Sequence, residues 1–174
     1  MNSLSQYIIE KLHINKDTDI YNYYPKDRDE LKSLVDKLIG ERGDEADLND
    51  IDVSNVTAMY NMFFDSNFNG NISNWDVSNV TNMYCMFYDS KFNGDISKWN
   101  VSKVKNMYKM FAHSKFNQDI SEWDICNVKD MRDMFRGSNF NNDISSWNVN
   151  NDTNMHNMFV DSPLKNNPPK WYHE

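Results

Sequence analysis

Cysteine, glycine, proline and basic residues are all scarce in this chain of 174 residues. It has two cysteines, five glycines and four prolines. Two cysteines cannot build a disulfide framework, and no Cys/His cluster has the spacing of zinc ligands. So little glycine and proline excludes a collagen-like chain and Gly/Pro-rich disorder. With 18 basic and 26 acidic residues the net charge is −8, which argues against a nucleic-acid binder and against docking onto anionic membranes.

Long apolar runs are also missing. No stretch approaches the ~18 apolar residues of a membrane span, so we expect no membrane insertion. The first residues lack a basic region followed by an apolar run, so we expect no signal peptide. These features favour a cytoplasmic or virion-associated protein, or a cell-surface protein if a leader has been removed.

What is abundant recurs at one interval of 24 residues. The five tryptophans keep this spacing, and so do two methionine columns and one phenylalanine column. Their members are Trp75, Trp99, Trp123, Trp147 and Trp171; Met59, Met83, Met107, Met131 and Met155; Met62, Met86, Met110, Met134 and Met158; and Phe63, Phe87, Phe111, Phe135 and Phe159. Five units therefore run from about Asp52 to Trp171, and a fixed period of this kind indicates stacked repeats.

Each unit has two parts with different patterns. Trp75 and Val77 alternate around a polar residue, which predicts a short strand. Met83, Met86 and Phe87 have the i, i+3, i+4 spacing of one helix face, and Ser78 or Asn79 suits an N-cap. The sequence therefore predicts an α/β fold, a leucine-rich-repeat-like solenoid of five 24-residue strand-turn-helix units with an N-terminal helical cap.

The ends of the chain differ from the middle. Residues 1–23 predict a short amphipathic helix, over 3–12, and a loop, which together could dock to a partner. Residues 24–47 are predicted as the helical cap. Its helix is predicted over 26–41, with Asp27 and Glu30 forming a capping box at its start and Gly40 and Gly43 ending it. Residues 48–171 form the solenoid, which Trp171 closes, and 172–174 form a tail.

The repeated unit FNGDISxWDVSNVxNMxxMF resembles that of the BspA-like leucine-rich-repeat surface proteins, a repeat first catalogued as a domain of unknown function in mycoplasmas. The resemblance extends from about Leu48 to Phe159. It implies a solenoid with a non-enzymatic binding role. Members of the family are often exported to the bacterial surface and are sometimes linked to adhesion, and similar repeats occur in bacteriophage and giant-virus proteins.

Residues that could perform chemistry do not form a pattern. The four histidines occupy unrelated columns, and no nucleophile, phosphate-loop or HExxH motif is present, so we expect no enzyme, cofactor or metal site. Two columns of Asp and Asn, one with Asp76 and one with Asp95, could hold calcium, but we favour structural ladders. Cys85 is predicted in an exposed helix column and Cys126 in a turn, and no disulfide is expected between them.

Binding is predicted on two faces. Tyr and Arg, the residue types of interface hot spots, occupy two columns beside the buried Met/Phe stripe. These are Tyr60, Tyr84, Tyr108 and Arg132, then Phe64, Tyr88 and Arg136. The outward side of the predicted strands is the second candidate, with Asp76, Lys98, Glu122 and Asp124.

The sequence thus predicts a monomeric, non-enzymatic interaction module that binds a protein partner. Two alternatives stay open: a surface adhesin or carbohydrate-binding protein, and a phage or viral structural or accessory protein with an N-terminal docking helix. In the aromatic columns, simple packing of ring on ring is the competing interpretation.

Overall fold

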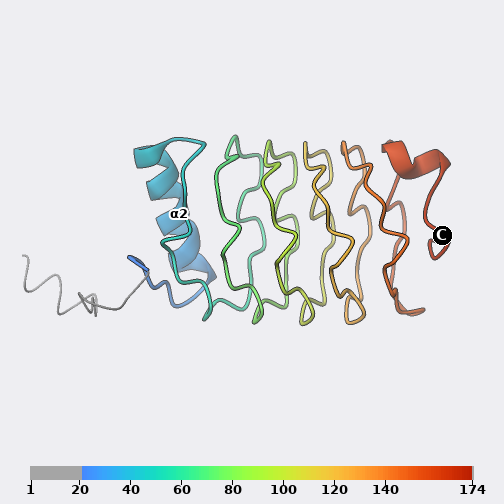
Figure 1. Ribbon diagram of the computed structural model, residues 1–174, viewed down its shortest axis with the longest axis horizontal. Coiled ribbons are helices and arrows are strands. Elements are labelled where there is room, and N and C mark those ends of the chain that lie inside the picture. Colours follow the sequence, from blue (N-terminus) through green and yellow to red (C-terminus); the bar gives the residue numbers. More distant parts are fainter. Residues whose placement is uncertain (1–20, 174) are drawn as a thin grey trace, which may run out of the picture.

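The computed structural model describes residues 21–173, so the predicted helix over 3–12 lies outside the described residues (Figure 1). Within the described part there is one α-helix, α2 (Arg28–Arg42), and one short 3-10 helix, η1 (Pro163–Asn166). Between them the chain winds through a row of similar irregular coils, with α2 at one end and η1 at the other (Figure 1).

The predicted α/β solenoid of strand-turn-helix units is wrong. Outside α2 and η1, the described residues form only isolated parallel bridges, such as Ala58 with Asn82 and Asn82 with Asn106. The segment from Ile72 to Val80 contains a pair of turns rather than a strand. The Trp75 N–H bonds the Ile72 carbonyl at 3.2 Å, and the Val80 N–H bonds the Val77 carbonyl at 2.9 Å. Apolar residues alternate here because tight turns follow one another.

The predicted helix over Met83–Phe87 is replaced by overlapping β-turns. The N–H groups of Met86, Tyr88 and Ser90 bond the carbonyls three residues earlier, at 3.2–3.3 Å. Cys85 and Asp89 have positive φ angles of 49° and 51°. A right-handed helix cannot pass through left-handed residues, so the i, i+3, i+4 spacing arises from turns with a positive φ at the third residue, the geometry of type II.

Positive φ recurs in two columns of the repeat. The first contains Asn61, Cys85, Lys109, Asp133 and Asn157, and the second contains Asp65, Asp89, His113, Gly137 and Asp161. Six of these ten residues are Asn or Asp, and a seventh is Gly, the residue types that best tolerate this conformation.

Backbone groups that a helix would satisfy internally are shared between neighbouring units. Four N–H groups of one unit, those of Met83, Cys85, Phe87 and Asp89, donate to carbonyls of the next unit at 2.8–2.9 Å. The acceptors are Asn106, Tyr108, Met110 and Ala112. The same four bonds join every pair of successive units, so each unit depends on its successor for its hydrogen bonds.

The apolar columns meet in one continuous core. Phe87 stacks on Phe111 at 5.5 Å between ring centroids, and Phe111 on Phe135 at 5.7 Å. Each tryptophan also donates its indole Nε1–H to a carbonyl of the preceding unit. The Trp99 nitrogen lies 3.2 Å from the Ile72 oxygen, and the Trp123 nitrogen lies 3.1 Å from the Ile96 oxygen. The tryptophan column therefore supplies both buried area and a hydrogen bond between units.

Helix α2 covers the first coil. The helix predicted over 26–41 is confirmed, because the Asp27 side chain accepts hydrogen bonds from the N–H groups of Asp29 and Glu30, and Leu31, Val35 and Leu38 are buried. The capping box is incomplete, since Glu30 accepts from the N–H of Lys26 rather than that of Asp27. Gly43, at φ 88°, ends the helix with its N–H on the Ile39 carbonyl.

A ladder of asparagines joins successive units. The backbone N–H groups of Asn93, Asn117 and Asn141 each donate to the Oδ1 of the asparagine 24 residues earlier, at 2.8 Å. The column with Asp76 instead makes turns within its own unit, as in the 3.0 Å bond from the Ser78 N–H to the Asp76 carboxylate. Ser78 is therefore a donor in an Asx turn and not a helix N-cap.

Candidate interaction surface

Two rows of side chains project from the β-turns that carry the positive-φ residues. We call them together the aromatic face, which consists of Tyr60, Tyr84, Tyr108, Arg132, Phe64, Tyr88 and Arg136. Each residue immediately precedes a positive-φ position, at the second corner of a turn. All are half-buried except Phe64, whose exposed fraction is 48%. The repeat therefore brings together the residues that the sequence singled out.

The first row is held by ring and guanidinium contacts along the stack. The Tyr84 and Tyr108 rings stack with centroids 5.5 Å apart. The Arg132 guanidinium carbon lies 4.8 Å from the centre of the Tyr108 ring. At the other end, Arg28 of α2 lies 4.4 Å from the centre of the Tyr60 ring. Such contacts stabilise each ring by about 0.5–1 kcal/mol at partly exposed sites, so the row is ordered before any ligand arrives.

The second row is more exposed. Phe64 stacks on Tyr88 at 4.9 Å with the rings 7° from parallel, and the edge of Tyr88 meets His113 at 5.6 Å. Phe64 and Tyr24 are the exposed large hydrophobic residues of the described chain. Ala112 interrupts the row because it is small and buried. The aromatic part of this row therefore lies over the first two units.

The arginines of the aromatic face are paired with acids. Arg132 donates twice to Asp130, at 2.9 and 2.7 Å, and Arg136 lies 3.2 Å from Asp133. Asp130 supports this geometry, since its Oδ1 also accepts the Arg132 backbone N–H at 3.1 Å. Positive charge at this end of the face is therefore largely balanced.

The second predicted face has no strand. Asp76, Lys98, Glu122 and Asp124 are all exposed. Asp76 and Asp124 hold Asx turns, with the Cys126 N–H donating to the Asp124 carboxylate at 3.2 Å. Among the described residues no hydrogen bond, ion pair or ring contact joins these four side chains to the aromatic face. They remain separate polar positions on the coil surface.

Both cysteines are free. Cys85, predicted in an exposed helix column, is instead buried, with 3% of its surface accessible. Burial raises the pKa of its thiol, which makes it a poor nucleophile at neutral pH. In residues 21–173, no three His, Cys, Asp or Glu side chains gather closely enough to hold a metal ion.

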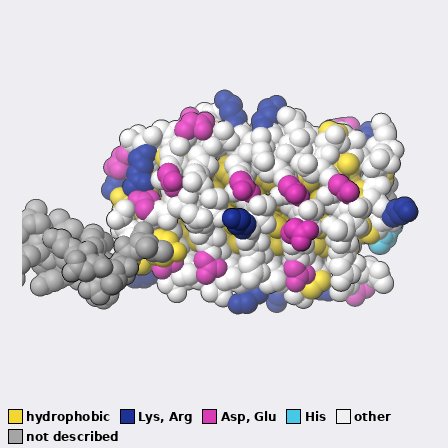
Figure 2. All heavy atoms as spheres, viewed as in Figure 1, with side chains coloured by type: hydrophobic (Ala, Val, Ile, Leu, Met, Phe, Trp, Pro, Cys, Tyr) yellow, Lys and Arg dark blue, Asp and Glu magenta, His cyan; other side chains and the backbone are white. Residues whose placement is uncertain are grey.

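A row of acidic side chains lies along another side of the stack. We call it the Asp row, which consists of Asp95, Asp119 and Asp143. Each carboxylate accepts the N–H of the serine two residues later, at 2.8–2.9 Å. These bonds lower the pKa of all three carboxyls. Figure 2 shows acidic side chains regularly spaced along the coils of one face.

Sequence reasoning missed Arg28. Its guanidinium Nε and Nη2 donate to the Tyr60 carbonyl at 3.1 and 3.0 Å, so α2 is tied to the aromatic face by hydrogen bonds as well as packing. No repeat signal marks this residue, because it lies outside the units. The positive-φ columns did carry a signal, namely the recurrence of Asp at 65, 89 and 161 with Gly at 137.

No α-helix in the described part is long and apolar enough to cross a membrane.

Comparison with known proteins identifies the repeat. No curated protein and no solved structure matches the chain. One family model matches twice, over residues 32–138 and over residues 88–171, and the two matches overlap within the repeats. They cover most of the sequence, which confirms the predicted resemblance, and the chain belongs to the family described as "Mycoplasma protein of unknown function, DUF285".

Proposed function

We propose that this protein is a non-enzymatic interaction module that binds a protein partner through the aromatic face. The observation that supports this most directly is the stacked pair of Phe64 and Tyr88, with Phe64 48% exposed in a chain whose other phenylalanines are buried or lie in the core columns. Aromatic and arginine side chains are enriched in interface hot spots. Rings already fixed by their neighbours lose little conformational entropy on binding.

The stacking favours a protein partner over a sugar. A sugar ring binds an aromatic side chain by lying on its open face. In the first row, Tyr108 has Tyr84 of the preceding unit on one side and Arg132 of the following unit on the other. Ring edges and hydroxyl groups remain available, and these suit the mixed apolar and polar contacts of a protein interface.

A non-enzymatic role agrees with how the titratable groups of the face are used. Asp130 and Asp133 are engaged by Arg132 and Arg136, and Arg28 is engaged by a carbonyl. A general acid or base needs a group free to exchange its proton with a substrate. These groups instead hold the surface in one shape.

The test is a pull-down from a lysate of the source with the full chain as bait, beside the variants Phe64→Ala and Tyr88→Ala. Tyr24→Ala is the matched control, since Tyr24 is also an exposed aromatic residue but lies outside the aromatic face. We expect a partner that both face variants lose and the control retains. Truncation of a hot-spot aromatic residue costs about 2 kcal/mol, or roughly 30-fold in affinity.

Equal recovery of the partner by all three variants would contradict the proposal. A chain lacking residues 1–23 separates the other docking hypothesis, because a partner lost only on this deletion binds the N-terminal segment. If no partner is recovered by the unmodified chain, glycan binding becomes the alternative to test.

A further inference from the structure

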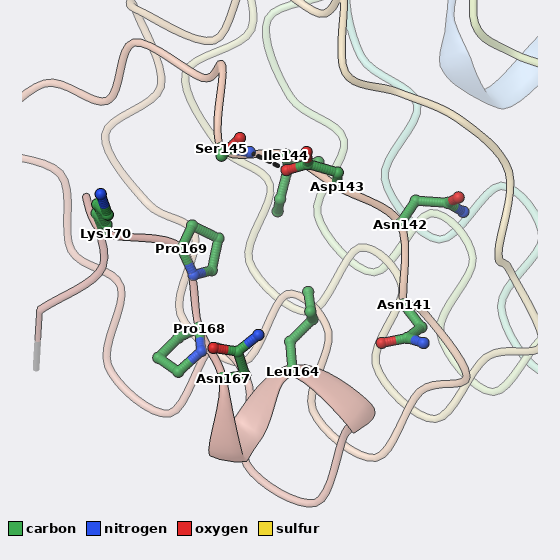
Figure 3. Close-up of a pocket in the computed structure, with 10 residues that line it drawn as sticks. All are labelled: Asn141, Asn142, Asp143, Ile144, Ser145, Leu164, Asn167, Pro168, Pro169 and Lys170. Atoms are coloured by element: carbon green, nitrogen blue, oxygen red, sulfur yellow. Dashed lines mark hydrogen bonds between the residues drawn. The ribbon is translucent and has the colours of Figure 1, made fainter.

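A hollow of about 600 Å³ lies at the C-terminal end of the stack, and it shares no residue with the aromatic face. One wall is the polar turn of Asn141, Asn142, Asp143 and Ser145. The opposite wall is the segment from Asn167 to Lys170, which follows η1 (Figure 3). The side chains of Ile144 and Leu164 lie between the two walls (Figure 3).

The hollow exists because the chain leaves the path of the repeat. In the preceding units, the Oδ1 of each ladder asparagine accepts the backbone N–H of the asparagine 24 residues later, at 2.8 Å each time. Lys165 stands 24 residues after Asn141, but its N–H bonds the Ser162 carbonyl instead. Pro168 and Pro169 have no N–H to offer. The Asn141 Oδ1 therefore accepts no hydrogen bond from any residue in the described range.

The polar wall is thus one side of an interface that the protein forms three times elsewhere. In each of those cases the other side is a polypeptide in an extended turn, with a backbone N–H directed at the asparagine oxygen. An unmet acceptor in the same column fits the same kind of group. A backbone N–H of a bound peptide is a group of this kind.

The acidic side chains at the hollow favour a bound group that carries positive charge. Asp119 and Asp143 line an adjoining hollow of about 250 Å³, which shares Asn142, Asp143 and Ser145 with the first. Within the ladder, the residue two positions after each donating asparagine is an acid of the Asp row. A further acid over Asp143 would add to this repulsion, whereas a cation would relieve it. The one cation lining the larger hollow, Lys170, belongs to the opposite wall.

We propose that the C-terminal hollow binds an extended peptide segment that carries a lysine or arginine. One backbone N–H of the segment donates to the Asn141 Oδ1. The basic side chain, two residues further on, pairs with the Asp143 carboxylate. Between these two points the segment contacts the half-buried side chain of Leu164. This site is separate from the aromatic face, and it stands or falls independently of the proposed function.

The test is a titration of the isotope-labelled full chain with the peptide acetyl-Ala-Asn-Gly-Lys-Ser-amide, followed by the NMR shifts of backbone amides. Two peptides serve as controls. In one, the asparagine nitrogen is methylated, which removes the donor. In the other, aspartate replaces lysine. We expect saturable shifts at Asn141, Asp143 and Ser145, with binding at least about 10-fold weaker for either control peptide.

Two variants test the assigned contacts. Asn141→Ala removes the acceptor oxygen but keeps the backbone N–H that bonds Asn117. Asp143→Asn removes the charge and keeps the turn, because Asn71 makes the same turn in the first unit with its Oδ1 3.1 Å from the Ser73 nitrogen. Asn139→Ala is the matched control, an exposed asparagine that does not line the hollow.

We expect Asn141→Ala to weaken binding of the lysine peptide by about 10-fold and Asp143→Asn to abolish the preference for lysine over aspartate. Asn139→Ala should bind as the unmodified chain does. The proposal is overturned if the lysine peptide gives no saturable shifts, if both charged peptides bind equally well, or if Asn141→Ala binds normally. Should Asn141→Ala fold poorly, the charge preference of Asp143→Asn still decides the outcome.

Discussion

The positive φ at the third residue of the turns can be tested by replacing either of two lysines with glycine. Lys109 has φ 55°, whereas Lys105, which also lies in the third unit, is not among the positive-φ residues. Lys109→Gly and Lys105→Gly remove the same charge and add the same freedom to the unfolded chain. Only Lys109→Gly removes a side chain from a residue with left-handed backbone conformation, which relieves a steric cost of about 1–2 kcal/mol.

The magnitude follows from what each lysine contacts. Lys109 loses a contact between its Nζ and the Tyr108 ring at 5.0 Å, worth about 0.5 kcal/mol. Both variants lose about 0.5–1 kcal/mol because glycine makes the unfolded chain more flexible. Lys109→Gly should therefore be more stable than Lys105→Gly by about 1 kcal/mol.

Urea unfolding followed by tryptophan fluorescence measures this difference, because four of the five indoles are buried in the core. A gap of 1 kcal/mol corresponds to about 2–4 °C in melting temperature for a chain of this size. In a helix, glycine at position 109 would instead cost about 1 kcal/mol relative to alanine. If Lys109→Gly is destabilised as much as Lys105→Gly, the turn geometry is refuted and the helical interpretation returns.

Three other changes test the contacts between units. Trp123→Phe deletes the indole bond to Ile96, whose carbonyl keeps only the Trp99 N–H as donor, and it leaves a cavity in the core, so the free energy of unfolding should fall by about 2–4 kcal/mol in urea. Arg28→Met removes both hydrogen bonds to the Tyr60 carbonyl and should cost about 1–3 kcal/mol, whereas a loss below about 0.5 kcal/mol would show that α2 needs only its apolar face. The carboxyl pKa values of the Asp row lie below the ordinary 3.8, so its stabilisation is complete above that pH and is lost as the pH falls from there through the lowered pKa values. A triple Asp→Asn variant of the row should show a flatter decline of the urea midpoint between pH 5 and about pH 2, and an unchanged decline would contradict this assignment.

The sequence predicts the repeat well because the core columns are invariant in spacing. A 24-residue period in Trp, Met and Phe requires that successive units place the same side chains against one another. The buried set matches those columns, down to Trp147 and Phe159. The helix α2 was also predictable, because Asp27 and the Leu31, Val35, Leu38 stripe follow capping and periodicity rules that operate within one element.

The conformation of the unit was not predictable in the same way. Three apolar residues at i, i+3 and i+4 occur both on a helix and in overlapping β-turns, and a short run cannot separate the two. What decides between them is φ at Cys85, and neither cysteine nor lysine at this position signals a left-handed residue. The neighbouring units, which supply the hydrogen bonds, override local propensity.

The two ends of the stack must differ, because each unit takes its hydrogen bonds from the next. At the first unit, Arg28 bonds the Tyr60 carbonyl that a preceding unit would otherwise bond. At the fifth unit, four N–H groups in the same columns donate to no residue of the described chain, those of Met155, Asn157, Phe159 and Asp161. Pro163 stands 24 residues after Asn139, whose N–H bonds the preceding unit, and proline has none to give. An interaction that uses backbone hydrogen bonds therefore forms more readily at the C-terminal end, where donors and the Asn141 oxygen remain unmet, than at the end closed by α2.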